Sequence, residues 1–412
     1  MDNSHGQCVI IGASHAGVSC AFFLRREGWS GNIILIDPDP ELPYHRPPLS
    51  KAFLTSEAGI EQYALKSREA YEKENIELRL GVVVANIDRS SKSLKLSDDT
   101  QLDYDILVIA TGARPLIPPI SGIDQAQNLY PLRTAKDVSD IKEAISKFRQ
   151  PKVVIIGGGY IGLEIAASVK KLGADATILE RESRVLARVT SPEMSTYFET
   201  LHAEHGVQIA SAKNVTEITV ANDSNLVKCG DGSTYPADVI IVGVGIRVND
   251  ELAVAAGLES INGIVVKTNT QTADDAIYAI GDCTSHYNPH YQRQLRLESV
   301  QNANDQAKIA AAAICGKEAV YDAIPWFWSD QFDAKLQMVG LSAGYDEVIV
   351  RIESNESKRS LWYFKGEELL AVDAVNNPKA YVIGGKFIKE RITVNKVSLR
   401  DPEVDLKPAN LI

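Results

Sequence analysis

The chain has 412 residues, of which 45% are hydrophobic and 24% charged, and its formal net charge is −11. At about 150 residues per domain, this length predicts two to four globular domains. The acidic balance argues against nucleic acid as the main partner, because phosphate binding needs a basic surface, and no apolar run approaches the roughly 18–20 residues of a membrane helix.

The N-terminus and the cysteines point to one compartment. "MDNSHGQ" has no basic region before an apolar core, so it does not match a signal peptide. The five cysteines are scattered and form no C-x-x-C pair, which predicts neither a zinc ribbon nor a local redox disulfide. We therefore expect a cytoplasmic protein whose thiols are kept reduced.

The first predicted element is the apolar strand of "CVIIGASHAG", followed by a glycine-rich loop with Gly12, Ser14 and Gly17 at the spacing G-x-G-x-x-G. The helix "VSCAFFLRREGW" and the strand "NIILI" come next, and the strand ends on Asp37, 20 residues after Gly17. Strand, glycine turn, helix, strand and acid form half of a Rossmann unit, whose carboxylate can reach the adenosine ribose. Ser14 replaces the middle glycine, and its small side chain still leaves room near a phosphate. Asp39 lies two residues beyond Asp37, and the sequence does not choose between them.

The same pattern recurs, complete, in "PKVVIIGGGYIGLEIAASVKKLGADATILE", with Gly157, Gly159 and Gly162 at the fingerprint positions. The first glycine allows a tight turn, the second lets a pyrophosphate approach the backbone, and the third lets the helix pack on the strand. Two such units 145 residues apart argue against a chance match. Glu180 ends the second strand and favours NADH, because a carboxylate binds the free 2′-hydroxyl and repels a 2′-phosphate. Arg181 and Arg184 follow it and leave NADPH open.

Each fingerprint has a downstream partner. "YDILVIATGARP" ends a strand in Ala110-Thr111-Gly112, and "ADVIIVGVGIRVN" ends another in Gly243-Val244-Gly245. "DAIYAIGDCTSH" then resembles the second flavin signature of flavoproteins with two dinucleotide-binding domains, in which the residue at Asp282 meets the cofactor. Because it follows the second fold, the chain must return to complete the first. The sequence therefore predicts one dinucleotide-binding fold inserted into another, with FAD in the first and the nicotinamide cofactor in the second.

Seven motifs together carry a family resemblance: "RPPLSK", "ATGARP", "IIGGGYIGLE", "RVLARVTSP", "GDC", "RLESVQNANDQA" and "PWFWSDQF". In this order they are similar to the FAD-dependent ferredoxin reductases of bacterial oxygenase systems. The resemblance implies an α/β fold of glutathione-reductase-like architecture. We expect a discontinuous FAD-binding domain (1–115 and 246–325), an NADH-binding domain (116–245) and a C-terminal α+β domain (326–412) that covers the flavin and docks ferredoxin.

The resemblance also implies site residues. Lys51 would lie near the isoalloxazine and Glu164 would pair with it beside the nicotinamide, so that the lysine stabilises the anionic reduced ring; a surface helix charge is the alternative for both. The implied FAD contacts are Gly12, Ser14, Ala16, Gly17, Asp37, Arg46, Lys51, Val84, Ala110, Thr111, Gly112, Arg133, Asp282 and Val300. The implied NADH contacts are Gly157, Gly159, Tyr160, Ile161, Gly162, Glu180 and Gly245.

The C-terminal region is the expected docking region. Residues 326–412 carry 12 Lys plus Arg and 13 Asp plus Glu, so they are almost neutral in an acidic chain. Because ferredoxins are generally acidic, this region, with Lys386, Lys389, Arg391 and Lys396, would receive the partner. Trp328 would lie between the flavin edge and that face, or else it is a core aromatic.

The function implied is transfer of a hydride from NADH to FAD, followed by transfer of single electrons to a [2Fe–2S] ferredoxin that serves a haem-thiolate monooxygenase or a Rieske dioxygenase. We expect a monomer. The alternatives are a rubredoxin reductase and an apoptosis-inducing-factor-like flavoprotein. A disulfide reductase is excluded because no cysteine lies between Cys20 and Cys229. His202 and His205 lie three residues apart on a predicted helix, but no third metal ligand is near in the sequence, so we expect no metal site.

Overall fold

The computed structural model describes residues 5–221 and 224–412. The chain divides into two compact units, and each is discontinuous in sequence. Unit 1 comprises Met1–Arg46, Ala58–Arg114 and Ile246–Ala323. Unit 2 comprises Pro47–Glu57, Pro115–Gly245 and Ile324–Ile412.

Unit 1 is built on a five-stranded parallel sheet in the order β19-β7-β1-β2-β3. Its strands are β1 (Cys8–Ile11), β2 (Ile33–Asp37), β3 (Ile76–Leu80), β7 (Ile106–Ile109) and β19 (Ile277–Ala279). β1 and β7 are buried along their whole length, as expected for parallel strands covered on both faces. The continuous apolar runs "CVII" and "ILVI" therefore form the centre of the sheet.

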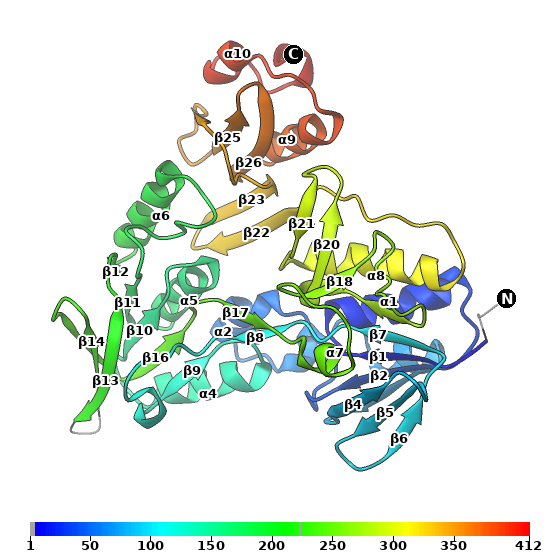
Figure 1. Cartoon of the computed structure of the whole chain (residues 1–412). Helices are drawn as coiled ribbons and strands as arrows, with labels where there is room; N and C mark the ends of the chain where they lie inside the picture. The colour runs from blue at the N-terminus through cyan, green and yellow to red at the C-terminus, as the bar shows by residue number, and fades with distance from the viewer. Residues whose placement is uncertain (1–4, 222–223) are drawn as a thin grey trace. The chain divides into compact units, whose positions relative to one another are not determined.

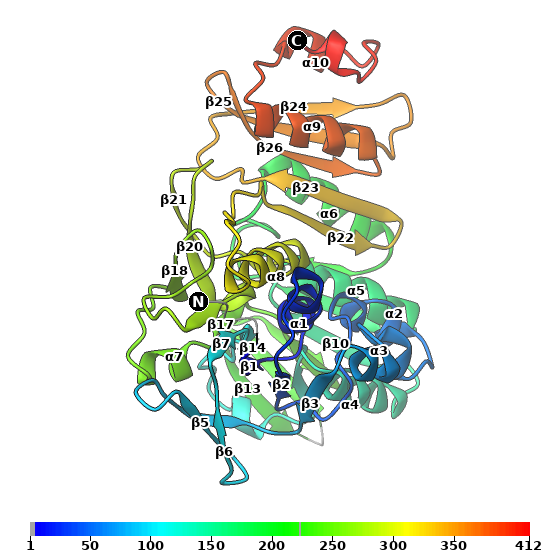
Figure 2. The same ribbon diagram turned by 90° about the vertical axis from the view of Figure 1, so that its right-hand side faces the viewer.

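Two hydrophobic clusters cover the two faces of this sheet, because successive side chains of a strand point to opposite sides. One face holds Cys8 and Ile10 against the helices α1 (His15–Glu27) and α8 (Val300–Ile314). The other face holds Val9 and Ile11 against a small antiparallel sheet. Figures 1 and 2 show α1 and α8 side by side, although they are far apart in the sequence.

The remaining elements of unit 1 are short. Those of the first part of the chain are α3 (Arg68–Lys73), β4 (Val84–Asp88), β5 (Ser93–Leu96), β6 (Gln101–Asp103) and β8 (Ala113–Pro115), the last of which ends at the boundary of the unit. Those of the returning part are β17 (Ile246–Val248), α7 (Glu251–Ala255), β18 (Ile264–Val266), η4 (Gly281–Cys283), β20 (Thr284–Asn288) and β21 (Arg293–Leu295). The return of the chain to unit 1 after the second fingerprint agrees with the predicted insertion.

Unit 2 contains a second parallel sheet in the order β12-β11-β10-β16-β9. Its strands are β9 (Leu129–Pro131), β10 (Lys152–Ile156), β11 (Asp175–Leu179), β12 (Gln208–Ala210) and β16 (Val239–Val242). Its helices are α4 (Ala135–Ser146), α5 (Tyr160–Lys171) and α6 (Pro192–Glu204). The antiparallel strands β13 (Val215–Ala221), β14 (Ser224–Cys229) and β15 (Thr234–Ala237) form a separate three-stranded sheet. The second fingerprint therefore lies in a second parallel α/β fold, as predicted.

The C-terminal part of unit 2 is a five-stranded antiparallel sheet, in the order β22-β23-β26-β25-β24, with α9 (Pro378–Glu390) across it (Figure 2). Its strands are β22 (Trp326–Gln331), β23 (Ala334–Gly340), β24 (Glu347–Ile352), β25 (Arg359–Lys365) and β26 (Glu368–Val375). α9 packs close to the sheet because Gly384 faces Val372, where an added Cβ would approach the valine side chain to 2.5 Å. The short helices η1 (Pro47–Ser50) and α2 (Ala52–Thr55) also belong to unit 2.

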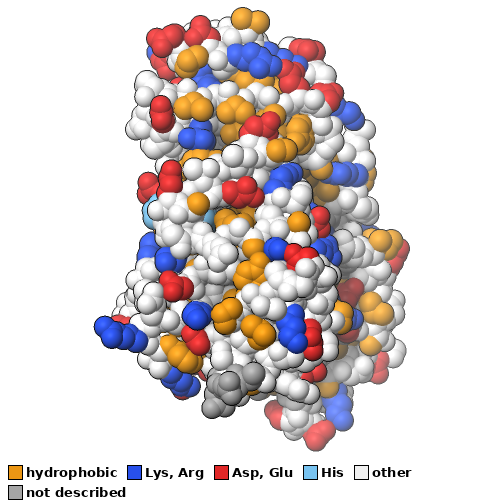
Figure 3. Space-filling view, turned by 90° about the vertical axis from the view of Figure 1, so that its left-hand side faces the viewer, with side chains coloured by type: hydrophobic (Ala, Val, Ile, Leu, Met, Phe, Trp, Pro, Cys, Tyr) orange, Lys and Arg blue, Asp and Glu red, His pale blue; other side chains and the backbone are white. Residues whose placement is uncertain are grey.

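In the ranges that the structure describes, no helix combines the length and the apolar character needed to cross a bilayer. Figure 3 shows one face of the molecule, on which acidic and basic side chains are interspersed and hydrophobic side chains lie among them.

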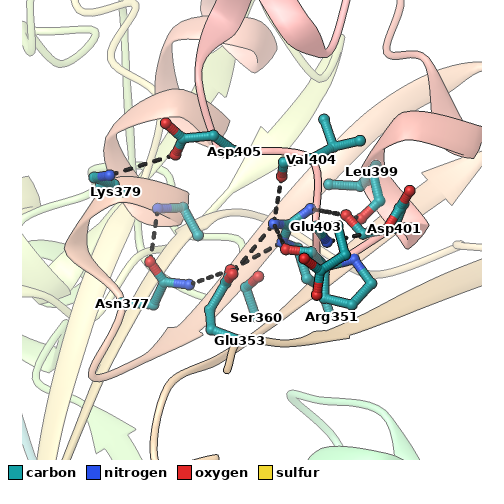
Figure 4. Close-up of polar contacts among 12 residues, drawn as sticks. Arg351, Glu353, Ser360, Asn377, Lys379, Leu399, Asp401, Glu403, Val404 and Asp405 are labelled. Atoms are coloured by element: carbon teal, nitrogen blue, oxygen red, sulfur yellow. Dashed lines mark hydrogen bonds and ion pairs between the residues drawn. The ribbon is translucent and has the colours of Figure 1, made fainter. Parts of the chain in front are cut away.

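A buried arginine of the C-terminal sheet binds the backbone of residues 399–404, as Figure 4 shows. Arg351 of β24 is 1% exposed and pairs with Glu353 (Nε to Oε1, 2.9 Å). Its guanidinium also donates to four backbone carbonyls. One belongs to Leu399 in the last turn of α10 (Lys396–Arg400), at 3.2 Å, and three follow this helix: Asp401 (2.8 Å), Pro402 (3.2 Å) and Val404 (2.7 Å). These residues form the Arg351 clasp, which satisfies buried polar groups that would otherwise lack partners.

Candidate active site

The glycine loop of unit 1 follows β1 at the carboxyl edge of the sheet. Gly12 has φ +105°, and a Cβ there would lie 2.2 Å from the carbonyl oxygen of Ala110. Gly17 allows an equally close approach, because a Cβ would lie 1.8 Å from the carbonyl oxygen of Gly12. Ser14 is the N-cap of α1, whose first turn contains no acidic side chain. The positive end of the helix dipole is therefore available to an anion.

Asp37 ends β2 beside this loop. Ala13 N–H donates to Asp37 Oδ2 at 2.6 Å, and Asp39 N–H donates to Oδ1 at 2.8 Å. Burial raises the pKa of Asp37 above its usual value. Asp39 instead accepts from the Tyr44 hydroxyl (2.7 Å) and lies 3.8 Å from Arg46. Asp37 is thus the acid that touches the loop, while Asp39 holds the side chains of the "YHR" segment.

Two further segments reach the same edge because β7 and β19 are parallel to β1. Thr111 follows β7, and its hydroxyl donates to the carbonyl of Asn249 at 2.6 Å, while the Asn249 side-chain amide donates to the Thr111 carbonyl at 2.9 Å. Gly281 follows β19, and its ideal Cβ would lie 3.1 Å from Cβ of Ala16. The structure therefore brings the first loop, Asp37, "ATG" and "GD" together at one edge of unit 1.

Three predicted FAD residues lie outside these segments. Val84 begins β4 and is buried in the hydrophobic cluster that covers one face of the sheet. Val300 is the first residue of α8, after the N-cap Ser299. Arg133 belongs to unit 2, where its backbone N–H donates to Asp137 at the start of α4.

The glycine loop of unit 2 repeats the geometry of the first. Gly157 has φ +112°, and a Cβ there would lie 2.4 Å from the carbonyl oxygen of Gly243. A Cβ on Gly162 would lie 2.0 Å from the carbonyl oxygen of Gly157. Gly159 differs, because a Cβ there meets no atom within 4 Å. The space in front of the middle glycine is therefore open, which fits the approach of a pyrophosphate.

Glu180 occupies the place in unit 2 that Asp37 occupies in unit 1. Its Oε2 accepts from Gly158 N–H at 2.6 Å, and its Oε1 accepts from Glu182 N–H at 2.7 Å. Arg181 is exposed and forms an ion pair with Glu182 at 3.0 Å. Arg184 turns into its own loop, where it donates to the Ser195 hydroxyl and to the carbonyls of Ala187 (3.0 Å) and Thr190 (2.9 Å). Its guanidinium is thus engaged by protein atoms.

The predicted pair of Lys51 and Glu164 is formed. Lys51 Nζ lies 2.6 Å from Glu164 Oε2, and the side chain of Glu164 is only 2% exposed. The hydroxyl of Ser50 donates to Oε2 (2.6 Å) and that of Ser329 donates to Oε1 (2.6 Å). Lys51 directly precedes α2, and Ser168 of α5 fixes the turn before it by donating to the Ser50 carbonyl at 2.6 Å. Glu164 is therefore a buried carboxylate with a cation and two hydroxyl donors, which is the condition for keeping a charge inside a protein.

The predicted aromatic and docking residues also lie in unit 2. Tyr160 begins α5, and its ring lies 5.1 Å from that of Phe327. Trp328 is half-buried on β22, with its ring 5.8 Å from that of Trp326. Gly245 has φ +120°, and Ile161 is 44% exposed. Lys386 and Lys389 are exposed on α9.

His202 of α6 and His205, the residue that caps this helix, have packing partners. His202 Nε2 lies 2.9 Å from Gln331 Oε1, and the rings of both His202 and His205 contact that of Phe332. Their predicted absence from a metal site is not tested by these contacts. Among residues 5–221 and 224–412, no three His, Cys, Asp or Glu side chains gather as metal ligands would.

The family model described as "Pyridine nucleotide-disulphide oxidoreductase" matches residues 6–307. The chain belongs to this family. A second model, described as "Reductase C-terminal", matches residues 326–410. All five cysteines are unpaired, so the family's name does not imply a redox disulfide in this member.

One curated protein and two solved structures with high similarity to this chain support the same family. Putidaredoxin reductase CamA of Pseudomonas putida is 43% identical over 410 residues, which cover 98% of this chain and 97% of the relative. The solved covalent putidaredoxin reductase–putidaredoxin complex matches with a TM-score of 0.93, 43% identity and 97% coverage of each chain. The ferredoxin reductase for the CYP199A2 system from Rhodopseudomonas palustris matches with a TM-score of 0.94, 37% identity, and coverage of 98% and 99%. The predicted resemblance and α/β fold class are thereby confirmed, and the chain is an oxidoreductase of this family.

Sequence reasoning missed the polar side chains that support the site. Ser50 lies directly before Lys51 in "RPPLSK", and Ser329 and Gln331 lie in "WFWSDQ". Gln306 accepts from Gly281 N–H at 2.7 Å and from Thr284 Oγ1 at 3.0 Å, which fixes the "GD" turn. Serine and glutamine are common everywhere, so only the tertiary contacts distinguish these four.

Proposed function

We propose that this protein transfers a hydride from NADH to a bound FAD and passes the two electrons, one at a time, to two molecules of a [2Fe–2S] ferredoxin, with release of one proton. The observation that carries the proposal is the buried ion pair of Lys51 and Glu164, formed next to the second glycine fingerprint. Its support in the relatives is that one solved neighbour is a reductase bound to its own redoxin.

The residues of unit 1 fit FAD. Gly12 and Gly17 place no Cβ atom at the two points where the loop meets other backbone closely, the start of α1 carries no acidic side chain, and Asp37 ends the strand β2. Arg46 would neutralise the pyrophosphate, since its Nε lies 3.4 Å from the hydroxyl of Ser14 in that loop. The remaining FAD contacts proposed are those predicted above, with Asp282 and Thr111 in the two segments that reach the same edge.

Once bound, FAD would supply the exchange between two-electron and one-electron chemistry. Lys51 would place a positive charge, fixed by Glu164, where negative charge develops on reduction. Because the ammonium is already positioned and its partner is buried, little reorganisation is needed at the moment of transfer.

The residues of unit 2 support NADH as the donor. Glu180 offers a carboxylate to a 2′-hydroxyl, and the guanidinium of Arg184 is held by Ser195 and two carbonyls. Arg181, the other arginine that follows Glu180, pairs with Glu182.

We further propose the domains predicted above, with residues 326–412 as the docking region for ferredoxin through Trp328, Lys386 and Lys389. Lys396 contributes less charge there, because it pairs with Glu347 (2.9 Å) and Glu367 (3.2 Å). The terminal acceptor proposed is a haem-thiolate monooxygenase or a Rieske dioxygenase. A monomer in the cytoplasm is proposed from the unpaired thiols and the use of the C-terminal region for docking.

The test is anaerobic, NADH-driven cytochrome c reduction with and without an added [2Fe–2S] ferredoxin, with flavin reduction followed separately by stopped flow. We expect a large, salt-sensitive stimulation by ferredoxin and a Lys51→Ala variant that slows flavin reduction. Equal rates with and without several ferredoxins would contradict the choice of partner and favour a rubredoxin. A gel shift of nucleic acid at physiological salt would instead favour an apoptosis-inducing-factor-like role.

A further inference from the structure

A chain of buried polar side chains continues from Glu164 away from Lys51. Glu164 Oε1 lies 2.6 Å from the hydroxyl of Ser329, which lies 3.1 Å from Gln331 Nε2. Gln331 Oε1 then lies 2.9 Å from His202 Nε2. The four residues form the Glu164–His202 chain, and all four belong to unit 2.

Three different elements build this chain. Ser329 and Gln331 are alternate residues of β22, so their side chains leave the same face of the strand. Glu164 comes from α5 and His202 from α6. The side chain of Glu164 is 2% exposed and the three others 0% exposed, so the chain is shielded from bulk solvent. If these positions served only for packing, apolar side chains of similar volume would stabilise the fold as well or better.

The hydrogen bonds of the chain run in one direction. A carboxylate only accepts, so the single hydroxyl proton of Ser329 is given to Glu164. The Ser329 oxygen must then accept, which assigns the NH₂ group of Gln331 to the side facing the serine. The carbonyl oxygen of Gln331 consequently faces His202, whose Nε2 must carry a proton. Every donor in the chain points towards Glu164, and such bonds strengthen one another in a low-dielectric interior.

His202 contributes a donor without contributing a charge. Burial lowers its pKa to about 4, so the ring is neutral near pH 7. The titratable groups acting on the chain are Lys51 at the Glu164 end and His205 at the histidine end. Nδ1 of His202 has no hydrogen-bond partner among the described residues, which agrees with the Nε2–H form.

Phe332 follows Gln331 in the two-residue turn between β22 and β23 and packs against the histidine end of the chain. Its φ is +53°, a left-handed conformation that is uncommon for a bulky residue. Its ring stacks on that of His205 at 3.8 Å and meets that of His202 edge-on at 5.0 Å.

We propose that Ser329, Gln331 and His202 are positioning residues: their directed hydrogen bonds hold the Glu164 carboxylate in one orientation and thereby fix Lys51. The role in catalysis rests on the proposed function, whereas the orientation of the chain does not. None of the three is proposed to touch a cofactor.

The first test measures the tautomer and the ring proton of His202 in the Glu164–His202 chain, by NMR of flavin-loaded protein labelled with ¹⁵N-histidine. The protein has seven histidines, and the signal that disappears in His202→Gln is assigned to His202. We expect a neutral Nε2–H ring with a slowly exchanging proton between about pH 6 and 8. We also expect this proton resonance to move in Glu164→Gln, an isosteric change at the far end of the chain. The Nδ1–H form, or a resonance indifferent to Glu164→Gln, would overturn the proposal.

The second test measures flavin reduction by NADH in stopped flow. Gln331→Leu and His202→Leu should lower the rate constant about tenfold with little change in the NADH concentration for half-saturation, because a misplaced charge affects the transition state rather than binding. His202→Gln keeps a donor near the Nε2 position and should recover most of the rate. Glu204→Gln, an exposed residue of the same helix outside the chain, is the control and should behave as the unchanged protein.

The two proposals fail separately. If the flavin of Lys51→Ala is reduced at the normal rate, the proposed role of the ion pair is wrong, whatever the results for the variants of the Glu164–His202 chain. If Lys51→Ala is slow but Gln331→Leu and His202→Leu are not, the ion pair stands and the positioning role is overturned.

Discussion

Asp373 of β26 is a buried acid whose partners are all neutral. Its Oδ2 accepts from the hydroxyls of Tyr363 (2.6 Å) and Thr190 (2.7 Å). Burial raises the pKa of Asp373 to about 6 despite these two hydrogen bonds. It contrasts with Glu164, for which a lysine supplies the opposite charge.

Stability should therefore depend on pH through Asp373. Because its folded pKa lies above its unfolded pKa, the folded protein binds the proton more tightly, and this stabilisation is complete below the unfolded pKa and lost as pH rises through about 6. We expect the free energy of unfolding to fall by about 3 kcal/mol from this group between about pH 4 and 7, and Asp373→Asn to lack that fall. Urea unfolding of both proteins across this range measures the difference. A constant difference between the two would contradict this, because it would mean that the pKa of Asp373 is the same in the folded and unfolded states.

Glu180 is the residue on which nicotinamide choice should depend. Glu180→Ala removes the carboxylate that repels a 2′-phosphate, so the ratio of kcat/KM for NADPH to that for NADH should rise about tenfold. Steady-state kinetics with both donors measure this ratio, with Glu204→Ala at the end of α6 as the control. An unchanged ratio would mean that another group discriminates between the donors.

At the scale of elements, the parallel sheet of each unit explains why residues far apart in the chain come together at one edge of that unit. Each functional segment directly follows a strand, and parallel strands end at the same edge. In unit 1 these segments follow β1, β2, β7 and β19, and in unit 2 they follow β10, β11 and β16. The glycines then remove the Cβ atoms that would block the contacts between neighbouring segments.

The Arg351 clasp should contribute strongly to the stability of the C-terminal sheet. Arg351→Met removes a buried cation and leaves Glu353 and several carbonyls without their donor, at an expected cost of about 3 kcal/mol. Thermal unfolding and limited proteolysis near Asp401 measure the loss, which Arg351→Lys should not repair because lysine lacks the planar fork. Lys379→Met is the control, because its ion pair with Asp405 is exposed and contributes little. Equal stability of Arg351→Met and the control would mean that other contacts hold the chain end.

At the scale of the whole molecule, charge is distributed unevenly along the sequence. The chain has a net charge of −11, whereas its last 87 residues are nearly neutral. An acidic ferredoxin would be repelled by most of the chain and less by this region. Long-range fields of this kind affect the rate of encounter and are weakened by salt.

Reversing two charges on α9 should therefore impair ferredoxin reduction alone. In Lys386→Glu/Lys389→Glu we expect the apparent KM for ferredoxin to rise about tenfold at low salt and the difference to shrink as salt is added. NADH-driven ferricyanide reduction should stay unchanged, because a small acceptor needs no docking. The control is Lys365→Glu, which reverses the charge of an exposed lysine on β25 of the C-terminal sheet. If ferredoxin kinetics do not change, docking occurs elsewhere on the surface.

The sequence by itself determined the fold class, the duplicated fingerprint, the return of the chain to the first fold and the family. These are local signals: glycines where only glycine fits, strands read from continuous apolar runs, and acids at strand ends. It also selected Lys51 and Glu164, although only by resemblance, and it left Asp37 and Asp39 as equal candidates.

Only the tertiary structure decided the rest. It placed Asp37 against the glycine loop, turned Arg184 away into its own loop, and assembled Ser50, Ser329, Gln331 and His202 around the buried ion pair. Those four residues are ordinary in sequence and lie up to 281 positions apart. Their importance comes from the cost of leaving a buried polar group unpaired, and that cost exists only once the chain has folded and excluded water.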